Sequence, residues 1–227
     1  MYKVIVRIVV CSLMGCLGVV AAAPSQGAGV PSGYRELLSR NNSMLLLIDL
    51  QPQFALATRT IGKDDLTSNA VGIAKVAKLF EVPTILSSNR ASTYGGPFFA
   101  EITKALPKLA VHDRTVINAF DDADVAKAIR EAGRKKRIIG GLWTDNCVML
   151  PALTALKQGY DVYVLADVSG DVDVQSHQLA ISRLVHAGAI PVTWLAVMLE
   201  WQWDWADTTT AGEVGALFSE SMAARKP

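Results

Sequence analysis

The sequence predicts an α/β fold with a doubly wound, mostly parallel sheet of six strands and helices on both faces. Six short apolar segments recur along the chain, and stretches with helical periodicity separate them. Strand, helix and strand in succession indicate right-handed crossovers, which build parallel sheets that helices cover on both sides. The sequence shows no internal repeat and no Gly-x-Gly-x-x-Gly fingerprint. We therefore expect a Rossmann-type three-layer sandwich.

The expected elements follow in order along the chain. Residues 34–40 predict a short amphipathic helix, and the unbroken apolar run at 44–48 is typical of a central strand buried on both faces. The other expected strands span residues 82–86, 111–117, 137–142, 162–166 and 190–194. The expected helices cover about 64–80, a short stretch up to 106, and then 122–132, 147–158 and 175–187, with loops at 51–62 and 87–98. In such sheets ligands bind at the carboxyl ends of the strands.

The first 23 residues predict an export signal. Lys3 and Arg7 give a positive start, residues 8–20 are almost continuously apolar, and three alanines at 21–23 form a small-residue cleavage site. The apolar run is too short for a typical transmembrane helix. Residues 24–32 have the composition of a flexible linker. We expect a periplasmic or secreted protein that is cleaved near Ala23 and keeps no membrane span.

Two alternatives for the leader stay open. Residues 13–16 resemble a lipoprotein signal in which Cys16 would be acylated, and a downstream translation start would leave a cytoplasmic protein. If the leader is cleaved, Cys11 and Cys16 leave with it, so that Cys147 is the one remaining cysteine. A single cysteine forms no internal disulfide. An unpaired thiol in an oxidising compartment favours a chemical role.

The composition excludes some partners. A length of 227 residues fits one ordinary domain, and the 22 basic and 21 acidic residues leave a formal charge of +1. This balance gives no electrostatic footprint for nucleic acid, so the expected partner is a small-molecule substrate. His112, His177 and His186 are scattered without metal-ligand spacing and are expected to be structural or surface residues. We therefore predict no metal and no cofactor.

Cys147 lies where the strand at 137–142 ends and the next helix begins. Thr144 or Asp145 is a suitable N-cap, which would place Cys147 in the first helical turn. The helix dipole and free backbone N–H groups would there favour the thiolate and could stabilise an oxyanion. The alternative is a small buried cysteine that only packs in the core.

Asp49 directly follows the apolar strand at 44–48. A buried carboxylate needs a polar or charged partner. Beside a thiol, it can accept the thiol proton and return it to a leaving amine. The alternative is a carboxylate that only caps a loop.

Three segments together resemble the isochorismatase-like cysteine hydrolases. Leu46–Gln51 is similar to the first-strand motif of this superfamily, Gly141–Val148 to its cysteine motif, and Arg114–Phe120 to the segment that carries its third catalytic residue. The resemblance covers about residues 40–200. It is greatest to the YcaC-like branch, including the region of Glu200 and Trp205.

The resemblance implies a catalytic triad of Asp49, Arg114 and Cys147, with arginine at a position that more usually holds lysine. An arginine would lower the thiol pKa and orient Asp49, but it does not shuttle protons because its pKa exceeds ~12. The resemblance also implies a non-proline cis peptide, here at Trp143–Thr144. The oxyanion would then bind the backbone N–H groups of Thr144 and Cys147.

Other positions are weaker candidates for function. Metal-dependent relatives carry an aspartate and paired histidines after the second strand, whereas this chain has Ser87–Ser92 there. Asn89 and Arg90 end that strand and are candidates for substrate binding, with a plain surface arginine as the alternative. Four tryptophans in the C-terminal part could line a pocket between subunits or only pack, namely Trp194, Trp201, Trp203 and Trp205.

The sequence therefore favours a metal-independent cysteine hydrolase that acts on a small amide or carbamoyl compound through a thioester. Residues 41–227 would form the hydrolase domain with a C-terminal helical tail, after a linker and short helix at 24–40. Two alternatives remain, a catalytically silent member that binds small molecules and an ether hydrolase of the isochorismatase type. The resemblance also implies a homo-oligomer.

Overall fold

The structure, a computed structural model, describes residues 36–224. The predicted signal peptide and the linker at 24–32 lie outside this range. The described residues form a six-stranded sheet in the order β3-β2-β1-β4-β5-β6, in which every pair of neighbours is parallel. This is the doubly wound sheet that the sequence predicts.

The strands are β1 (Ser43–Ile48), β2 (Thr84–Asn89), β3 (Val111–Arg114), β4 (Lys136–Leu142), β5 (Asp161–Gly170) and β6 (Ile190–Val192). The helices are α1 (Pro52–Ala57), α2 (Lys63–Leu79), α3 (Ala100–Ala105), α4 (Ala123–Glu131), α5 (Met149–Lys157), α6 (Val174–His186), α7 (Trp194–Gln202) and α8 (Ala211–Ala224). Three shorter turns are η2 (Ala91–Gly95), η3 (Ala119–Asp121) and η4 (Thr144–Val148).

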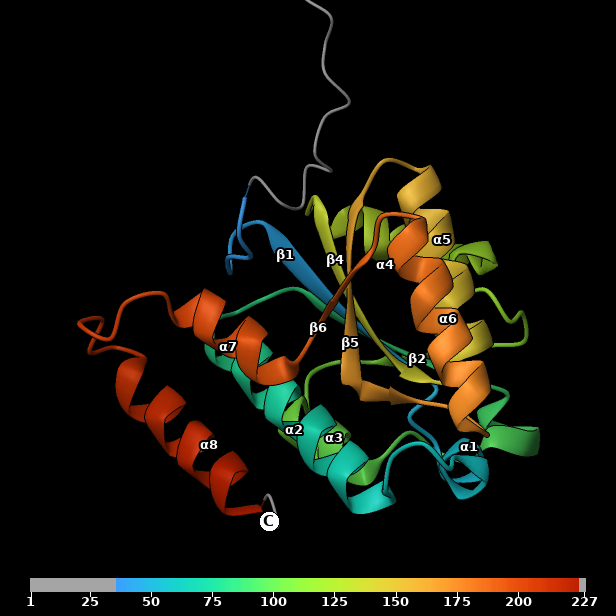
Figure 1. The fold of residues 1–227 in the computed structure, drawn as a ribbon, viewed down its shortest axis with the longest axis horizontal. Coiled ribbons are helices and arrows are strands. Elements are labelled where there is room, and N and C mark those ends of the chain that lie inside the picture. Colours follow the sequence, from blue (N-terminus) through green and yellow to red (C-terminus); the bar gives the residue numbers. More distant parts are fainter. Residues whose placement is uncertain (1–35, 225–227) are drawn as a thin grey trace, which may run out of the picture. The chain divides into compact units, whose positions relative to one another are not determined.

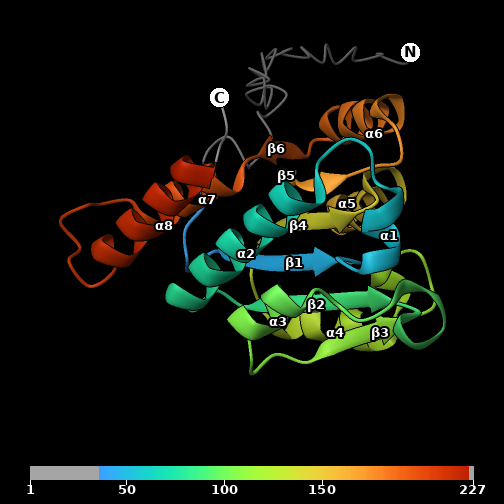
Figure 2. The same cartoon turned by 90° about the horizontal axis from the view of Figure 1, so that it is seen from below.

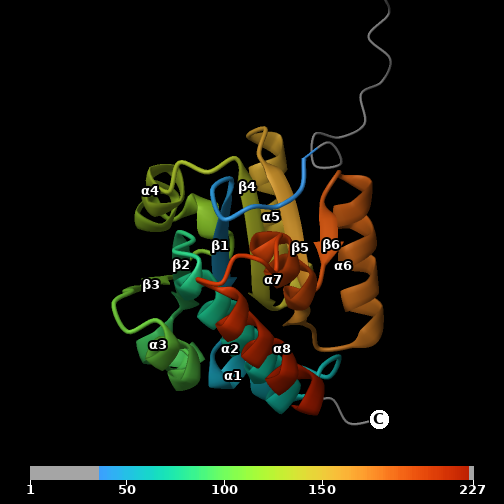
Figure 3. The same ribbon diagram turned by 90° about the vertical axis from the view of Figure 1, so that its left-hand side faces the viewer.

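Helices cover both faces of the sheet (Figures 1 and 3), and an apolar core lies under each helical layer. Leu45 and Leu47 of β1 join the core under α1, α2, α3, α7 and α8, whereas Met44, Leu46 and Ile48 join the core under α4, α5 and α6. All six residues of β1 are buried. Successive side chains of a strand point to opposite faces. A continuous apolar run is therefore what a strand between two helical layers requires.

The direction of winding reverses between β1 and β4. The chain runs from β1 outward to β2 and β3, and then returns to place β4 on the other side of β1. Figure 2 shows the strands side by side with their carboxyl ends toward α1. A crevice at such a reversal is the usual ligand site of doubly wound sheets. Asp49 follows β1 and η4 follows β4, so both segments lie at this point.

Two sequence expectations were wrong in detail. Residues 36–40 form no helix, because the N–H groups of Leu38 and Ser39 bond to the side chains of Glu200 (2.6 Å) and Asn42 (2.8 Å) instead of to helical carbonyls. The segment expected as a loop at 51–62 contains α1, which begins at Pro52. Proline is favourable at this first helical position because its missing N–H would have no partner there.

The four tryptophans divide into two groups. Trp194 and Trp201 are buried in the core, whereas Trp203 and Trp205 are exposed after α7. Within residues 36–224, no helix is both long and apolar enough to cross a membrane.

Candidate active site

Asp49 is the first residue after β1, and its backbone adopts the left-handed conformation with φ of 53°. Its N–H donates to the Ser87 carbonyl at 2.8 Å, which ties it to the neighbouring strand β2. Aspartate tolerates this conformation better than most residues do. The turn directs a fully buried carboxylate into the carboxyl edge of the sheet.

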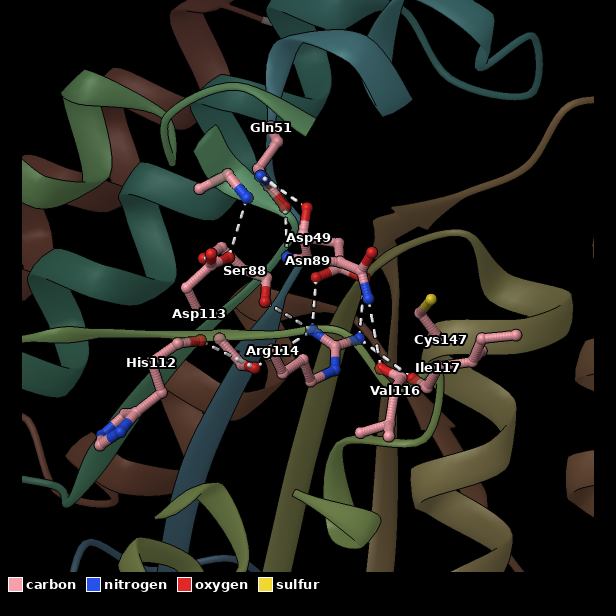
Figure 4. Close-up of polar contacts among 12 residues, drawn as sticks. Asp49, Gln51, Ser88, Asn89, His112, Asp113, Arg114, Val116, Ile117 and Cys147 are labelled. Carbon is pink, nitrogen blue, oxygen red and sulfur yellow. Dashed lines mark hydrogen bonds and ion pairs between the residues drawn. The ribbon is translucent and has the colours of Figure 1, made fainter. Parts of the chain in front are cut away.

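Arg114, the last residue of β3, holds both oxygens of this carboxylate. Its Nη1 lies 2.6 Å from Asp49 Oδ1 and its Nη2 lies 2.8 Å from Asp49 Oδ2, with both side chains fully buried. The same guanidinium donates to Ser87 Oγ, the Ser88 carbonyl and the Ile117 carbonyl, each at 3.1 Å. Figure 4 shows these contacts and the Cys147 side chain beside them. Such a bidentate pair fixes the orientation of the carboxylate.

Cys147 lies in η4, the turn that joins β4 to α5, and is 8% exposed. Its thiol lies beside the Asp49 carboxylate, close enough for the Asp49 charge to act on the pKa of Cys147. Asp49, Arg114 and Cys147 come from three separate strand ends, and the structure brings them into one linked group. The described part of the chain holds no other cysteine.

The surroundings of Cys147 oppose the thiolate that the helix-terminus argument expects. Burial raises the pKa of Cys147 above its usual range and the charge of Asp49 adds to this, whereas Arg114 and the Trp143 backbone lower it. Burial also raises the pKa of Asp49, and the Arg114 guanidinium lowers it. Arg114 binds Asp49 directly, so its charge compensates the carboxylate more than it favours a thiolate.

The turn around the cysteine differs from the expectation in two ways. The cis peptide is Leu142–Trp143, one residue before the predicted Trp143–Thr144 bond, because β4 ends at Leu142 and the turn starts there. Residues 144–148 form a π-type turn without a side-chain cap, and α5 begins only at Met149. Thr144 and Asp145 are therefore not the N-caps that the sequence suggested.

The backbone donors predicted for the oxyanion lie in this turn. The Cys147 N–H donates to its neighbour Asn146 Oδ1 at 2.6 Å. The side-chain oxygen of Asn146 thus already accepts a hydrogen bond from the Cys147 N–H. A substrate oxygen that used the Cys147 N–H would take the place of Asn146 Oδ1.

His177 and Asp171 hold the turn from the opposite side, and neither role was predicted from the sequence. The Thr144 hydroxyl donates to the Gly170 carbonyl at 3.0 Å and lies 2.9 Å from His177 Nδ1. Since the hydroxyl has one hydrogen, Nδ1–H is the donor in the second contact. Asp171, fully buried, accepts from the Asp145 N–H at 2.9 Å. Burial lowers the pKa of His177, and the charge of Asp171 opposes this.

Gly141 permits the close approach of β4 to β1 beside Asp49. Its φ is 145°, and a Cβ atom there would lie 1.9 Å from the Ile48 carbonyl oxygen. A side chain at this position would therefore force the two central strands apart. Only glycine combines this backbone conformation with this contact.

The two residues predicted to bind substrate have different places. The Asn89 Nδ2 donates to the Val116 carbonyl at 3.2 Å, and its backbone N–H donates to Gln51 Oε1 at 2.8 Å, so Asn89 lies beside Asp49 (Figure 4). Arg90 is exposed, with Nε 3.3 Å from Thr93 Oγ1 and its guanidinium over the Tyr94 ring. The structure therefore places Asn89, but not the charge of Arg90, in the site.

An aromatic group borders the turn. The ring of Phe54 meets those of Tyr94 and Trp143 edge to face, with centroid distances of 5.7 and 5.3 Å. Trp143 Nε1 donates to the Phe54 carbonyl at 3.1 Å, which joins α1 to the cysteine turn. Among residues 36–224, no group of three or more His, Cys, Asp or Glu side chains has the arrangement of a metal site.

Comparison with known proteins identifies the relatives of this chain. The family model for the isochorismatase domain matches residues 43–195. The Escherichia coli protein "Probable hydrolase YcaC" is 36% identical over 169 residues, which cover 74% of this chain and 81% of that protein. Two solved structures have a TM-score of 0.78. YcaC from Pseudomonas aeruginosa with hexane-2,5-diol and covalent acrylamide is 32% identical and covers 82% of this chain and 92% of its own. The E. coli YcaC structure, described as an octameric hydrolase of unknown specificity, is 33% identical. The match covers 82% of this chain and 91% of that chain.

Proposed function

The chain belongs to the isochorismatase family, and we propose that it is a metal-independent cysteine hydrolase that cleaves the C–N bond of a small amide or carbamoyl compound. The observation that carries this proposal is the position of Cys147 beside Asp49, with Arg114 binding both oxygens of the carboxylate. A thiol beside an oriented carboxylate is the arrangement that general-base activation of a nucleophile needs.

In the first half of the reaction, Asp49 takes the thiol proton as the Cys147 sulfur attacks the acyl carbon. Negative charge develops on the acyl oxygen, which the N–H groups of Thr144 and Cys147 would bind in place of Asn146 Oδ1. The C–N bond then breaks, and the leaving amine takes the proton from Asp49. The products of this half are the free amine and a thioester on Cys147.

In the second half, Asp49 accepts a proton from water while the water oxygen attacks the thioester. The tetrahedral adduct expels the sulfur, which takes the proton back from Asp49, and the carboxylic acid leaves. Arg114 keeps its charge throughout and holds the carboxylate in one orientation. Because its pKa exceeds ~12, Arg114 acts as a fixed charge and not as a proton carrier.

One relative supports a reactive nucleophile. The P. aeruginosa YcaC structure contains covalent acrylamide. Acrylamide reacts with nucleophiles at its alkene carbon, so we carry this to the present chain only as support for nucleophilic chemistry and not for the choice of substrate.

A catalytically silent binding protein is the second candidate, and one observation favours it. The raised pKa of Cys147 disfavours a thiolate at rest. The two candidates differ in whether Asp49 removes the thiol proton during attack. Hydrolysis of an ether, as in isochorismatase-type chemistry, would not need Cys147 and is separated from both by the Cys147→Ala variant.

We also propose that the protein assembles into a homo-oligomer and is exported. The E. coli YcaC structure is an octamer, which supports the first point. The apolar leader with its alanine cleavage site supports the second. Native mass spectrometry tests the assembly, and the mass of the mature N-terminus tests processing near Ala23.

The test of the proposed function measures ammonia or amine release from small amides and carbamoyl compounds. The variants are Cys147→Ala and Asp49→Ala, and Glu81→Gln is the matched control because Glu81 is an exposed carboxylate between α2 and β2 at the opposite edge of the sheet. We expect release by the wild type and by Glu81→Gln, with loss in the other two. Release that persists in Cys147→Ala would contradict the thioester route, and binding without release by any form would favour the silent protein.

A further inference from the structure

We propose that the site accepts uncharged amides with a short apolar acyl group and excludes substrates that carry a carboxylate. This inference rests on the proposed function, and it names the substrate class of the same site. Four observations carry it. They are the charges of the loops at the carboxyl edge, the contacts that the arginines of these loops already make, the acidic side chains next to Cys147, and the apolar side chains beside Asp49.

The loops at the carboxyl edge carry more acidic than basic residues. Five segments follow the strand ends or line this edge, namely residues 49–62, 90–99, 114–122, 143–148 and 170–174. They contain six aspartates, three arginines and no lysine. The aspartates are Asp49, Asp121, Asp122, Asp145, Asp171 and Asp173. The edge that holds the nucleophile is thus negative, although the whole chain is close to neutral.

Each of the three arginines already binds a group of the protein. Arg114 binds Asp49. Arg59 Nη1 donates to the Leu56 carbonyl at 2.8 Å and to the Thr58 carbonyl at 3.2 Å. Arg90 contacts Thr93 and its guanidinium lies 6.0 Å from the centroid of the Tyr94 ring. A substrate carboxylate would therefore have to break an existing contact to gain one of these three arginines as its partner.

Three acids lie on the side of the cysteine turn. Asp145 is two residues before Cys147, and its N–H donates to Asp171. The charges of Asp171 and Asp173 act on the Asp145 carboxylate, as the raised pKa of Asp145 indicates, with burial as the larger cause. An anionic substrate that approached Cys147 from this side would meet the same charges. Like charges at such distances repel, and salt screens the repulsion.

Apolar side chains border the site on the side of Arg114. The Ile117 carbonyl accepts from the same Arg114 nitrogen that binds Asp49, and the Val116 carbonyl accepts from Asn89 (Figure 4). These bonds hold the loop after β3 beside Asp49, and its side chains are 38% (Val116) and 55% (Ile117) exposed. An apolar acyl group could cover them and gain the free energy of removing apolar surface from water.

The test compares the alkylation of Cys147 by iodoacetamide, iodoacetate and 2-bromoethylammonium, which are neutral, anionic and cationic. Mass spectrometry of the peptide that contains Cys147 gives each rate, and N-acetylcysteine gives the reference ratios. We expect the iodoacetate-to-iodoacetamide ratio at Cys147 to be about five-fold below the reference at low salt, since a few like charges lie nearby. Asp145→Asn should raise the ratio, and added salt should raise it too. Glu81→Gln, which removes an exposed acid between α2 and β2 at the opposite edge, should leave it unchanged.

Two outcomes would overturn the inference. One is a ratio at or above the reference, which would show that the site tolerates or attracts an anion. The other is a ratio of the 2-bromoethylammonium rate to the iodoacetamide rate that is higher at Cys147 than in N-acetylcysteine, which would indicate a cationic substrate. Neither outcome depends on turnover.

A parallel series measures turnover with butyramide, succinamate and 3-aminopropionamide, which place a methyl, a carboxylate and an ammonium at the same position. Ammonia release from butyramide alone would support both proposals. No release from any amide, together with a low alkylation ratio, would refute the hydrolase but keep the charge selection. Release from succinamate at the rate of butyramide would keep the hydrolase and refute the charge selection.

Discussion

Replacing Asp49 by asparagine should change turnover and thiol acidity in opposite directions. The substitution keeps the shape of the side chain but removes the group that accepts the thiol proton, so we expect turnover to fall by about 10²–10⁴-fold. It also removes the negative charge and the hydrogen bond by which Asp49 raises the pKa of Cys147, while the lowering effect of Arg114 remains. The pKa of the thiol should therefore fall in the variant that has lost activity.

The cost to stability follows from the buried ion pair. Both side chains are fully buried, and removal of one partner leaves the Arg114 charge uncompensated. Such a loss costs about 3–5 kcal/mol, and asparagine should stay near the lower value because its oxygen still accepts one bond. For a domain of this size, 1 kcal/mol changes the melting temperature by about 2–4 °C, so we expect a fall of about 6–12 °C. The variant should still be folded at 25 °C.

Three measurements check this prediction. The pH dependence of iodoacetamide labelling at Cys147 follows the thiol, ammonia release follows turnover, and thermal unfolding follows stability. Glu81→Gln is again the control, because this exposed carboxylate lies between α2 and β2 at the opposite edge of the sheet and should leave all three nearly unchanged. The reasoning is refuted if the Asp49→Asn thiol titrates at the same or a higher pH than in the wild type, or if turnover persists.

Three further predictions concern pH, the cysteine turn and the central strands. Because burial raises the pKa of Asp49 and the base must be ionised, kcat/KM should fall as pH decreases through a midpoint above the ordinary carboxyl value of ~3.9, and a profile that is flat down to pH 4 would contradict this. His177→Leu should lower kcat about ten-fold with little change in KM, because it removes the hydrogen bond to the Thr144 hydroxyl that holds the cysteine turn. His177→Asn keeps a donor and should restore most of the lost kcat; equal kinetics of the two variants would exclude a role of this hydrogen bond in positioning the turn. Gly141→Ala should prevent folding or cost several kcal/mol in urea unfolding, whereas Gly159→Ala, with nothing within 4 Å, should cost only about 1–2 kcal/mol; similar costs for both would show that the contact with β1 is unimportant.

The sheet and the main catalytic candidates were predictable because each depends on local sequence. Continuous apolar runs identified β1 and β4, and Asp49 and Cys147 follow the carboxyl ends of these strands, where function is expected. Arg114 entered the predicted triad through the family resemblance. The extra helix α1 was missed because six residues after a proline show too little periodicity to separate a helix from a loop.

The resting state of the thiol was not predictable from the sequence. The helix dipole and a nearby arginine both suggested a thiolate, but the outcome depends on burial and on which partner Arg114 faces. His177 was missed for a similar reason, since a single histidine on α6 carries no local sign that it contacts Thr144. The sequence signal that could have found it is a polar residue in the first turn of α6, because α6 follows β5 and β5 lies next to β4 in the sheet.

The proposed function requires that Cys147 carries the acyl group during turnover. To test this, the protein is mixed with the fastest amide of the series, the reaction is stopped in acid within milliseconds to seconds, and the intact mass and the mass of the peptide that contains Cys147 are measured. We predict an increase equal to the acyl group on that peptide, present in the wild type and in Glu81→Gln and absent in Cys147→Ala. Turnover without any acyl adduct, and continued turnover in Cys147→Ala, would rule out a thioester on Cys147.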